Sequence, residues 1–224
     1  YGNTGAYYNI AIGASAMKGT SNAKTAVFNT AIGNPITPLT TGSYVMGEIT
    51  SGSYNVALGN ASLGFLTSGS QNVAIGVSAL RNTSTASNNT ALGHQALYNN
   101  TTASKNTAVG SYALFSHVNS DLNPQNTAVG YAAGYLATGY SNTFIGGSTG
   151  LSATTGINQT FVGYGAGADI TLGTRNTILG CYSGNAGGLD IRTASNYIVL
   201  SDGSGNPRVI GDGSGNFGIG SNPA

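Results

Sequence analysis

The sequence predicts an all-β fold, a repetitive β-solenoid or β-roll built from coils of 17 residues with a few insertions. A five-residue phrase returns along the chain, reading Asn-Thr-Ala-Leu-Gly at 89–93 and Asn-Thr-Ala-Val-Gly at 106–110 and 126–130. From Gly59 to Gly110 the closing glycines stand 17 residues apart at every step. Helix-pair repeats need about 33 residues or more, so this period is typical of short β repeats.

Each repeat opens on an asparagine and ends on what we call the closing glycine. The clear pairs are Asn72 and Gly76, Asn89 and Gly93, Asn106 and Gly110, Asn126 and Gly130, Asn142 and Gly146, and Asn176 and Gly180. Looser copies occupy 9–13, 29–33, 55–59 and 159–163, the last with Gln159 in place of asparagine. We expect the asparagines of successive coils to hydrogen-bond in a ladder, as in stacked in-register strands.

Within the phrase, alternate residues fall on opposite faces, which is strand periodicity. Threonine and the aliphatic residue share one face, which we expect to point into the coil. A second short strand is expected in segments such as 95–97 and 112–114, with turn formers between the two strands. Two-strand coils stacked in parallel about 4.8 Å apart predict a rod of roughly 45–60 Å for ten to twelve coils.

The residue four places after the closing glycine divides the coils into two subtypes that join near residue 130. It is large and apolar in the N-terminal half and glycine in the C-terminal half. The positions are Met17, Leu63, Leu80, Leu97 and Leu114, then Gly134, Gly150, Gly167 and Gly184. Because glycine removes a side chain from every later coil, we expect those coils to be thinner or to pack more closely on a neighbour.

The predicted organisation is a β-roll shaft with inserts at 1–195 and a short C-terminal β-meander at 196–224. Two copies of Asp-Gly-Ser-Gly-Asn, 202–206 and 212–216, separate three short apolar runs. The first copy resembles the start of a calcium loop. Its sixth position is Pro207 and its twelfth is Gly213, where such a loop needs glycine and glutamate, so turn chemistry is the favoured interpretation.

Composition narrows the function classes. Charged residues make up 6% of the chain against a usual level of about 25%, and the net charge is +1, so no nucleic-acid partner is expected. No apolar run approaches the ~20 residues of a membrane span, so no membrane insertion is expected. The single cysteine, Cys181, excludes an intrachain disulfide. Thin, weakly charged coils bury little apolar area, so a closed homo-oligomer is expected, although physics alone does not fix the number of chains.

The search for catalytic, cofactor or metal sites gives no candidate, and the chain is not expected to be an enzyme. Residues 146–150 match the pattern Gly-x-Ser-x-Gly, but no helical pattern follows, as a nucleophile elbow would require. Glu48 is the only glutamate, so a carboxylate pair is unsupported. His94 and His117 are not at ligand spacing. A threefold axis could gather three copies of one histidine around a metal, but a solvated or packed histidine is favoured.

Several segments resemble a known family. The repeats at 89–102, at 130–134 and at 138–146 resemble the coils of bacteriophage tail fibres. Residues 198–206 with 218–220 are similar to the segment that precedes the self-cleaving intramolecular chaperone of such fibres, and we expect no cleavage within these 224 residues. The coils are also similar to the head repeats of trimeric autotransporter adhesins, whose unit is shorter. The resemblance covers most of the chain and is weakest at 14–54; it implies a homotrimer with left-handed coils.

Three functions follow as hypotheses. The first is a phage tail fibre in the virion tail that attaches to a host-cell glycan or protein or spaces the binding tip. The second is a bacterial surface adhesin, which would be extracellular. The third is an ice-binding solenoid suggested by regular threonines, disfavoured if these point inward. Recognition is expected in the inserts at 34–54, 117–125 and 181–195. The candidate receptor contacts are Tyr44, Glu48, His117, Asp121, Asp190 and Arg192.

Overall fold

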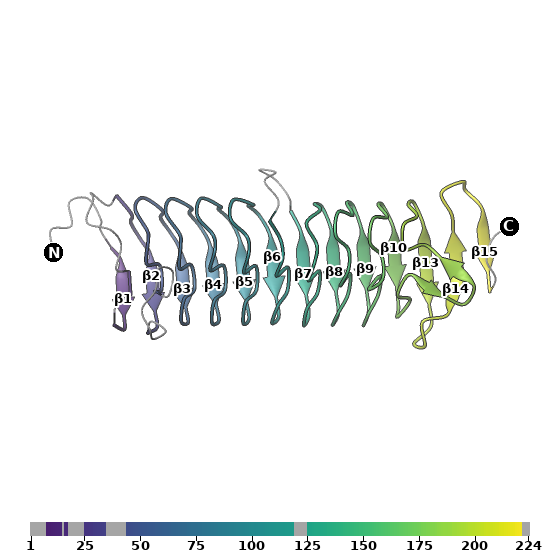
Figure 1. The fold of residues 1–224 in the computed structure, drawn as a ribbon, viewed down its shortest axis with the longest axis horizontal. Helices are drawn as coiled ribbons and strands as arrows, with labels where there is room; N and C mark the ends of the chain where they lie inside the picture. The colour runs from purple at the N-terminus through teal and green to yellow at the C-terminus, as the bar shows by residue number, and fades with distance from the viewer. Residues whose placement is uncertain (1–7, 15, 18–24, 35–43, 119–124, 221–224) are drawn as a thin grey trace.

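The computed structural model is a straight rod of stacked coils, with β1 and β15 at opposite ends (Figure 1). The structure describes residues 8–14, 16–17, 25–34, 44–118 and 125–220. Thirteen strands form one sheet in the order β1 to β10, then β13, β14 and β15. The eleven parallel strands, β1–β10 and β13, are separated by ten steps, which at about 4.8 Å each span roughly 48 Å. The all-β repeat solenoid with a C-terminal meander is therefore confirmed.

The first ten strands are three residues long, and each lies within one copy of the repeated phrase. They are β1 Ile10–Ile12, β2 Thr30–Ile32, β3 Val56–Leu58, β4 Val73–Ile75, β5 Thr90–Leu92, β6 Thr107–Val109, β7 Thr127–Val129, β8 Thr143–Ile145, β9 Thr160–Val162 and β10 Thr177–Leu179. Neighbouring strands pair in register, so that Thr90 faces Thr107 and Leu92 faces Val109. Equal positions of the repeat therefore line up in columns along the rod.

The second segment of each coil is a turn rather than the strand that we expected. After each closing glycine from Gly59 to Gly163, the residues two and four places later have positive φ, as at Ser78 (59°) and Leu80 (50°). Strands need extended dihedrals, so this backbone cannot be one. It still bonds between coils: the Leu80 N–H donates to the Ala96 carbonyl at 3.0 Å, and the Leu97 N–H donates to Ala113 at the same distance.

The asparagine ladder is confirmed and lies inside the rod. The Asn72 side-chain oxygen accepts the main-chain N–H of Asn89 at 3.0 Å, and the Asn89 oxygen accepts that of Asn106 at 2.9 Å. The Asn89 side-chain N–H also donates to the Ala103 carbonyl at 3.0 Å, which ties the strand to the turn of the next coil. The ladder is interrupted at Gln159, whose buried Oε1 has no partner among the described residues. Each asparagine side chain thus supplies hydrogen-bond partners to main-chain groups that have none within their own coil.

The closing glycines are required by close stacking as well as by backbone conformation. Gly59 has φ 128°, and a Cβ built on it would lie 2.7 Å from the carbonyl oxygen of Gly76 in the next coil. A real Cβ does not approach backbone this closely, so any other residue would force the coils apart. The same contact recurs along the column, which explains why the phrase ends on glycine in coil after coil.

The expectation that the threonine and aliphatic side chains point inward is wrong. In every strand from β2 to β10 the central residue is buried and the two outer residues are half-exposed or exposed. The core is formed by asparagine, the central alanine and the residue four places after the closing glycine. Because the buried asparagine and the central strand residue share one face by alternation, the threonine and aliphatic residues are left on the outside.

The C-terminal coils hold larger strand residues in their interior than the N-terminal coils do. From β8 onward the central strand residue becomes Phe144, Phe161 or Ile178 in place of alanine, and these side chains are fully buried. They occupy the space that leucine fills in the earlier coils. The glycines at 150 and 167 are therefore the complement of a larger strand residue rather than a loss of core volume.

The meander continues the same sheet. β13 (Ile198–Ser201) pairs in parallel with β10 and antiparallel with β14 (Pro207–Gly211), which pairs antiparallel with β15 (Phe217–Ile219). A separate hairpin, β11 (Asn185–Ala186) and β12 (Leu189–Asp190), projects from the last coil before it. β13 is thus both the last parallel rung and the first strand of the meander.

Candidate interaction surfaces

The first candidate surface, the outer sheet face, consists of the first and third residues of β1–β10 and β13. The third residue is aliphatic in all eleven strands. These residues are Ile12, Ile32, Leu58, Ile75, Leu92, Val109, Val129, Ile145, Val162, Leu179 and Leu200. Register continues this aliphatic column into the meander through Val209 and Ile219. No charged residue belongs to the face.

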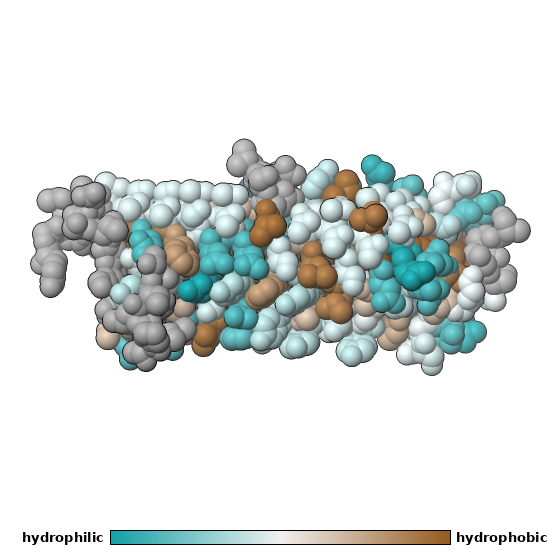
Figure 2. Space-filling model, viewed as in Figure 1, coloured by the Kyte–Doolittle hydropathy of each residue, from teal (hydrophilic) through white to brown (hydrophobic). Residues whose placement is uncertain are grey.

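Much of the outer sheet face is open to solvent in a single chain. Leu92 is 44% exposed, Ile12 is 57% exposed and Ile219 is 76% exposed. Monomeric soluble proteins seldom expose contiguous apolar patches of this extent, and such patches mark interaction sites. On the side of the rod seen in Figure 2, by contrast, apolar residues form separate patches among polar ones and no continuous band.

The other column of the outer sheet face is built mainly from threonine. From β5 to β10 six consecutive strands begin with it, and each one pairs in register with the next. They are Thr90, Thr107, Thr127, Thr143, Thr160 and Thr177. An in-register, outward threonine column therefore stands beside the aliphatic column, and not inside the coil.

A second candidate surface, the aromatic column, lies on the turns of the middle coils. Tyr98, Phe115 and Tyr135 all follow the closing glycine by five residues, and their rings stack at 5.2 and 5.0 Å. The Arg81 guanidinium continues the column, 5.8 Å from the Tyr98 ring centroid, and donates to the Tyr98 hydroxyl at 3.1 Å. Since the rings cover one another's faces, the stack mainly holds successive coils together, and its ring edges and hydroxyls face outward.

The tyrosines that follow closing glycines differ in exposure. Tyr131 and Tyr164 are 62% and 74% exposed, whereas Tyr112 is half-buried and meets the Tyr131 ring edge-on at 5.9 Å. Tyr182 is buried, and its hydroxyl donates to the Leu189 carbonyl at 2.9 Å. Burial, and secondarily the nearby carboxylate of Asp190, raises the pKa of Tyr182. Only Tyr131 and Tyr164 of this group present most of their surface to a partner.

The structure brings two of the predicted contact residues together. Arg192 forms a two-pronged ion pair with Asp190, with Nε to Oδ1 at 3.0 Å and Nη2 to Oδ2 at 2.7 Å. Hydrogen bonds from Arg192 hold the pKa of the Asp190 carboxyl below its usual range, and the same pairing raises the pKa of Arg192. With Thr171 and Thr193 the pair lines an open polar depression beside the β11–β12 hairpin. The depression offers charged groups and hydroxyls to hydrogen-bond a polar ligand.

The other four predicted contacts do not form a common site. Tyr44 and Glu48 are half-buried. Their stretch stacks on the next coil, where the Met46 N–H donates to the Ser62 carbonyl at 3.1 Å. Asp121 lies outside the described residues, as does 35–43 of the long insert. His117 is fully buried, which corrects its assignment as a surface contact: a side chain in the core cannot reach a receptor.

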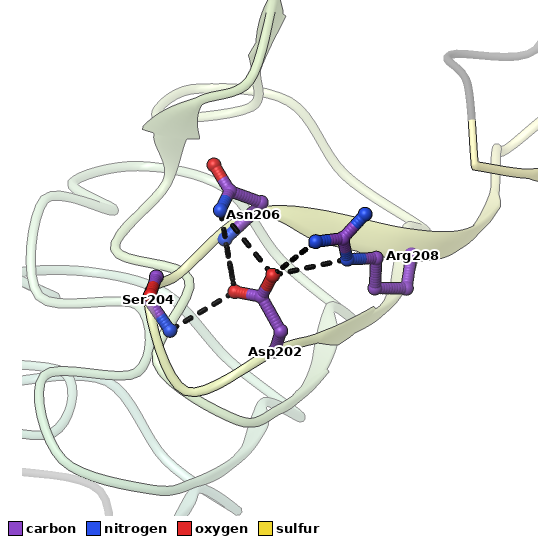
Figure 3. Close-up of polar contacts among 4 residues, drawn as sticks. All are labelled: Asp202, Ser204, Asn206 and Arg208. Atoms are coloured by element: carbon purple, nitrogen blue, oxygen red, sulfur yellow. Dashed lines mark hydrogen bonds and ion pairs between the residues drawn. The ribbon is translucent and has the colours of Figure 1, made fainter.

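The first Asp-Gly-Ser-Gly-Asn copy is a hydrogen-bonded turn (Figure 3). The Asp202 Oδ1 atom accepts the main-chain N–H groups of Ser204 at 3.0 Å and Asn206 at 2.9 Å, and Oδ2 accepts Arg208 Nε at 3.0 Å. The hydrogen bond from the Asn206 main chain, followed by that from the Arg208 side chain, lowers the pKa of Asp202 to about 2. The turn interpretation is confirmed, because internal donors engage both carboxylate oxygens.

Chemistry-bearing residues are sparse in the part of the chain that the structure describes. Within those residues no three histidine, cysteine, aspartate or glutamate side chains gather as a metal site would require. Residues 146–150, which match the nucleophile-elbow pattern, form a turn after β8 and are not followed by a helix. Across the described ranges no helix is long and apolar enough to cross a membrane.

Three features could not be read from the sequence: the outward direction of the outer sheet face, the aromatic column, and a row of buried polar residues formed by Thr83, Asn100 and His117. The aromatic column had a signal in the sequence, since its rings share one repeat position.

Comparisons of the chain with protein-family models, with curated proteins and with solved structures give no match.

Proposed function

We propose that this chain is the shaft of a homotrimeric fibre in the tail of a bacteriophage and contributes to attachment to a host-cell surface. The outer sheet face carries the proposal, because it is a long apolar surface on a chain with few charges. Burying it between copies would remove apolar area from water along the whole rod. The resemblance of the coils to tail-fibre repeats supports three copies, and the in-register columns suit a rotation axis parallel to the rod.

The shaft would present its other surfaces to the host. The depression around Asp190 and Arg192 offers a bidentate charged pair with two threonine hydroxyls, which suits sugar hydroxyls or the polar groups of a protein. The exposed rings of Tyr131 and Tyr164 add apolar contact area with a polar edge. The receptor class is therefore a cell-surface glycan or protein, bound by a rigid scaffold with local variations.

Assembly is tested by sedimentation of the full chain and two variants. Leu92→Lys on the outer sheet face is expected to shift the trimer toward monomer, because three lysines would be forced into an apolar interface. The matched control is Leu172→Lys, an exposed leucine outside the strands, which should leave the trimer unchanged. A stable wild-type monomer would refute the assembly.

Attachment is tested by binding of the fluorescently labelled chain to a panel of bacterial cells. Arg192→Ala is expected to lower binding at least tenfold because it removes the charged pair from the depression, whereas Arg175→Ala, which does not line the depression, should not. No binding to any member of the panel by a trimeric wild-type chain would count against attachment by this segment. In the gene, a chaperone domain after residue 224 selects the tail fibre, and a membrane-anchor barrel selects the bacterial adhesin.

The six-threonine column gives one specific reason to keep ice binding as a second candidate. Its threonines stand in register and point outward, as that function requires. Trimer formation would cover the same face, so the two functions exclude each other. Thermal hysteresis by the purified chain would favour ice binding, and its absence would eliminate it.

A further inference from the structure

His117 occupies a core position that is apolar in most other coils. It follows the closing glycine by seven residues, where Leu66, Ala137, Ala153 and Ile170 stand in other coils, all of them fully buried. Thr83 and Asn100 take this position in the two preceding coils and are also fully buried. The middle of the shaft therefore contains a buried polar row: Thr83, Asn100 and His117.

Hydrogen bonding along this row is incomplete. Asn100 Nδ2 donates to the Ala103 carbonyl at 2.8 Å, which fixes the amide so that Oδ1 is the free acceptor. His117 Nδ1 lies 3.1 Å from the Ala137 carbonyl oxygen and must carry the proton to bond with it. The neutral ring then has a lone pair on Nε2. Asn100 Oδ1 and His117 Nε2 are both buried without a partner among the described residues.

A proton on Nε2 would create a buried charge with little to balance it. The neighbouring coils present Asn100 and Ala137 to this corner, and neither is charged. No carboxylate or cation among the described residues acts on the ring: desolvation lowers the pKa of His117, and the Ala137 carbonyl opposes it more weakly. Asp121, the nearest acid in sequence, lies outside the described residues.

The sign of the pH effect follows from linkage. In an opened coil the imidazole is hydrated and titrates near its ordinary pKa of about 6.5, whereas the closed coil binds the proton only at lower pH. The open form therefore gains protons first as pH falls, and closing loses up to a factor of ten per pH unit below about 6.5. Above that pH the buried neutral ring carries no such penalty.

We infer that His117 makes the middle of the shaft an acid-sensitive joint, at which protonation favours local opening of the contacts that Leu114, Ser116 and His117 make with the next coil. Opening is local because repeats in a solenoid contact only their neighbours, so one coil can loosen while distant coils stay paired. The sequence insertion between His117 and Gln125 interrupts the 17-residue period in this same coil. The inference concerns a single chain's core and does not depend on the proposed function.

Hydrogen exchange of the full chain at pH 7.5 and 5.5, corrected for intrinsic rates, provides the test. The amides of Leu114 and Ser116, which donate to the next coil, should lose protection by up to about tenfold at pH 5.5. Leu63 and Ile178, several coils away, should not change. Equal protection of Leu114 at both pH values would overturn the inference.

Three variants assign the response to the buried ring. His117→Ala, which copies Ala137 of the next coil, should abolish the response, whereas His94→Ala, at the exposed histidine, and Asp121→Asn should retain it. A response that survives in His117→Ala, or that either control variant removes, overturns the inference. If His117→Ala does not fold, NMR titration of the wild type decides: the pKa of His117 must lie below the ordinary value of about 6.5, and an equal or higher value refutes the joint.

Discussion

The Phe144 ring occupies the space where a side chain at Gly150 would begin: a Cβ built there would lie 2.6 Å from Phe144 Cε1. The same relationship links Phe161 to Gly167 in the next coil. In the earlier coils the two positions hold Ala91 with Leu97, or Ala108 with Leu114. A large residue thus moves from the turn to the strand.

This exchange predicts strong coupling between Phe161 and Gly167. Phe161→Ala alone should cost about 3–5 kcal/mol by leaving a cavity, and Gly167→Leu alone should overpack the coil by about 1–3 kcal/mol or more. The double variant recreates the earlier Ala–Leu pair, and Leu tolerates the positive φ, as Leu97 does at 51°. Chemical denaturation should show a double variant more stable than the sum of the single effects by roughly 1–3 kcal/mol. Additive effects would contradict the exchange.

Restoring asparagine at the break in the ladder should stabilise the shaft. Gln159 Nε2 keeps the bond to the Gly173 carbonyl at 2.7 Å, but Oε1 is buried without a partner in the described structure. Gln159→Asn should let the side-chain oxygen accept the Asn176 N–H and raise stability by about 1 kcal/mol. Thermal unfolding should show a higher Tm. The reverse change, Asn142→Gln, should lower it, and a lower Tm for Gln159→Asn would show that the longer side chain fits the site.

Three glycines should respond differently to alanine. Gly93→Ala places a Cβ 2.6 Å from the Gly110 carbonyl oxygen with φ 139° and should cost more than about 3 kcal/mol through clash and strain. Gly165→Ala meets no atom within 4 Å but has φ 63°, so the cost should be about 1 kcal/mol. Gly203→Ala has neither problem and should be neutral or slightly stabilising. Denaturation midpoints should follow this order, and a mild effect at Gly93 would contradict the stacking argument.

The meander should weaken only in strong acid. The folded pKa of Asp202 is about 2, below the ordinary 3.8, so its stabilising contribution is fully present above pH 3.8 and is lost as pH falls through about 2. NMR titration of the carboxyl group measures the value directly. Arg208→Ala removes one partner and should raise it, whereas Arg175→Ala, outside the meander, should not. An ordinary pKa in the wild type would show that the turn does not persist in solution.

Much of the fold could be predicted because the repeat is regular. The coil length, the strand at each phrase, the asparagine ladder and the three meander strands follow from positions that recur, since equal positions must stack in register. The segment at 95–97 was wrongly expected as a strand, because sequence does not reveal that Gln95 and Leu97 have positive φ. The candidate sites were less predictable. Asp190 and Arg192 are close in sequence, so their pairing could be expected. The residues next to His117 in the sequence do not show that its side chain is buried.

The sequence alone determined the period, the β character, the low charge and the points where the pattern breaks, since these depend only on which residues recur and where. The tertiary structure decided which face of the strand points inward. Alternation divides Thr107 and Val109 from Ala108 but does not say which side is the core. The asparagine ladder decided it: Asn106 is buried where it bonds to the neighbouring coil, and Ala108 shares its face by alternation, so the threonine and aliphatic columns lie outside.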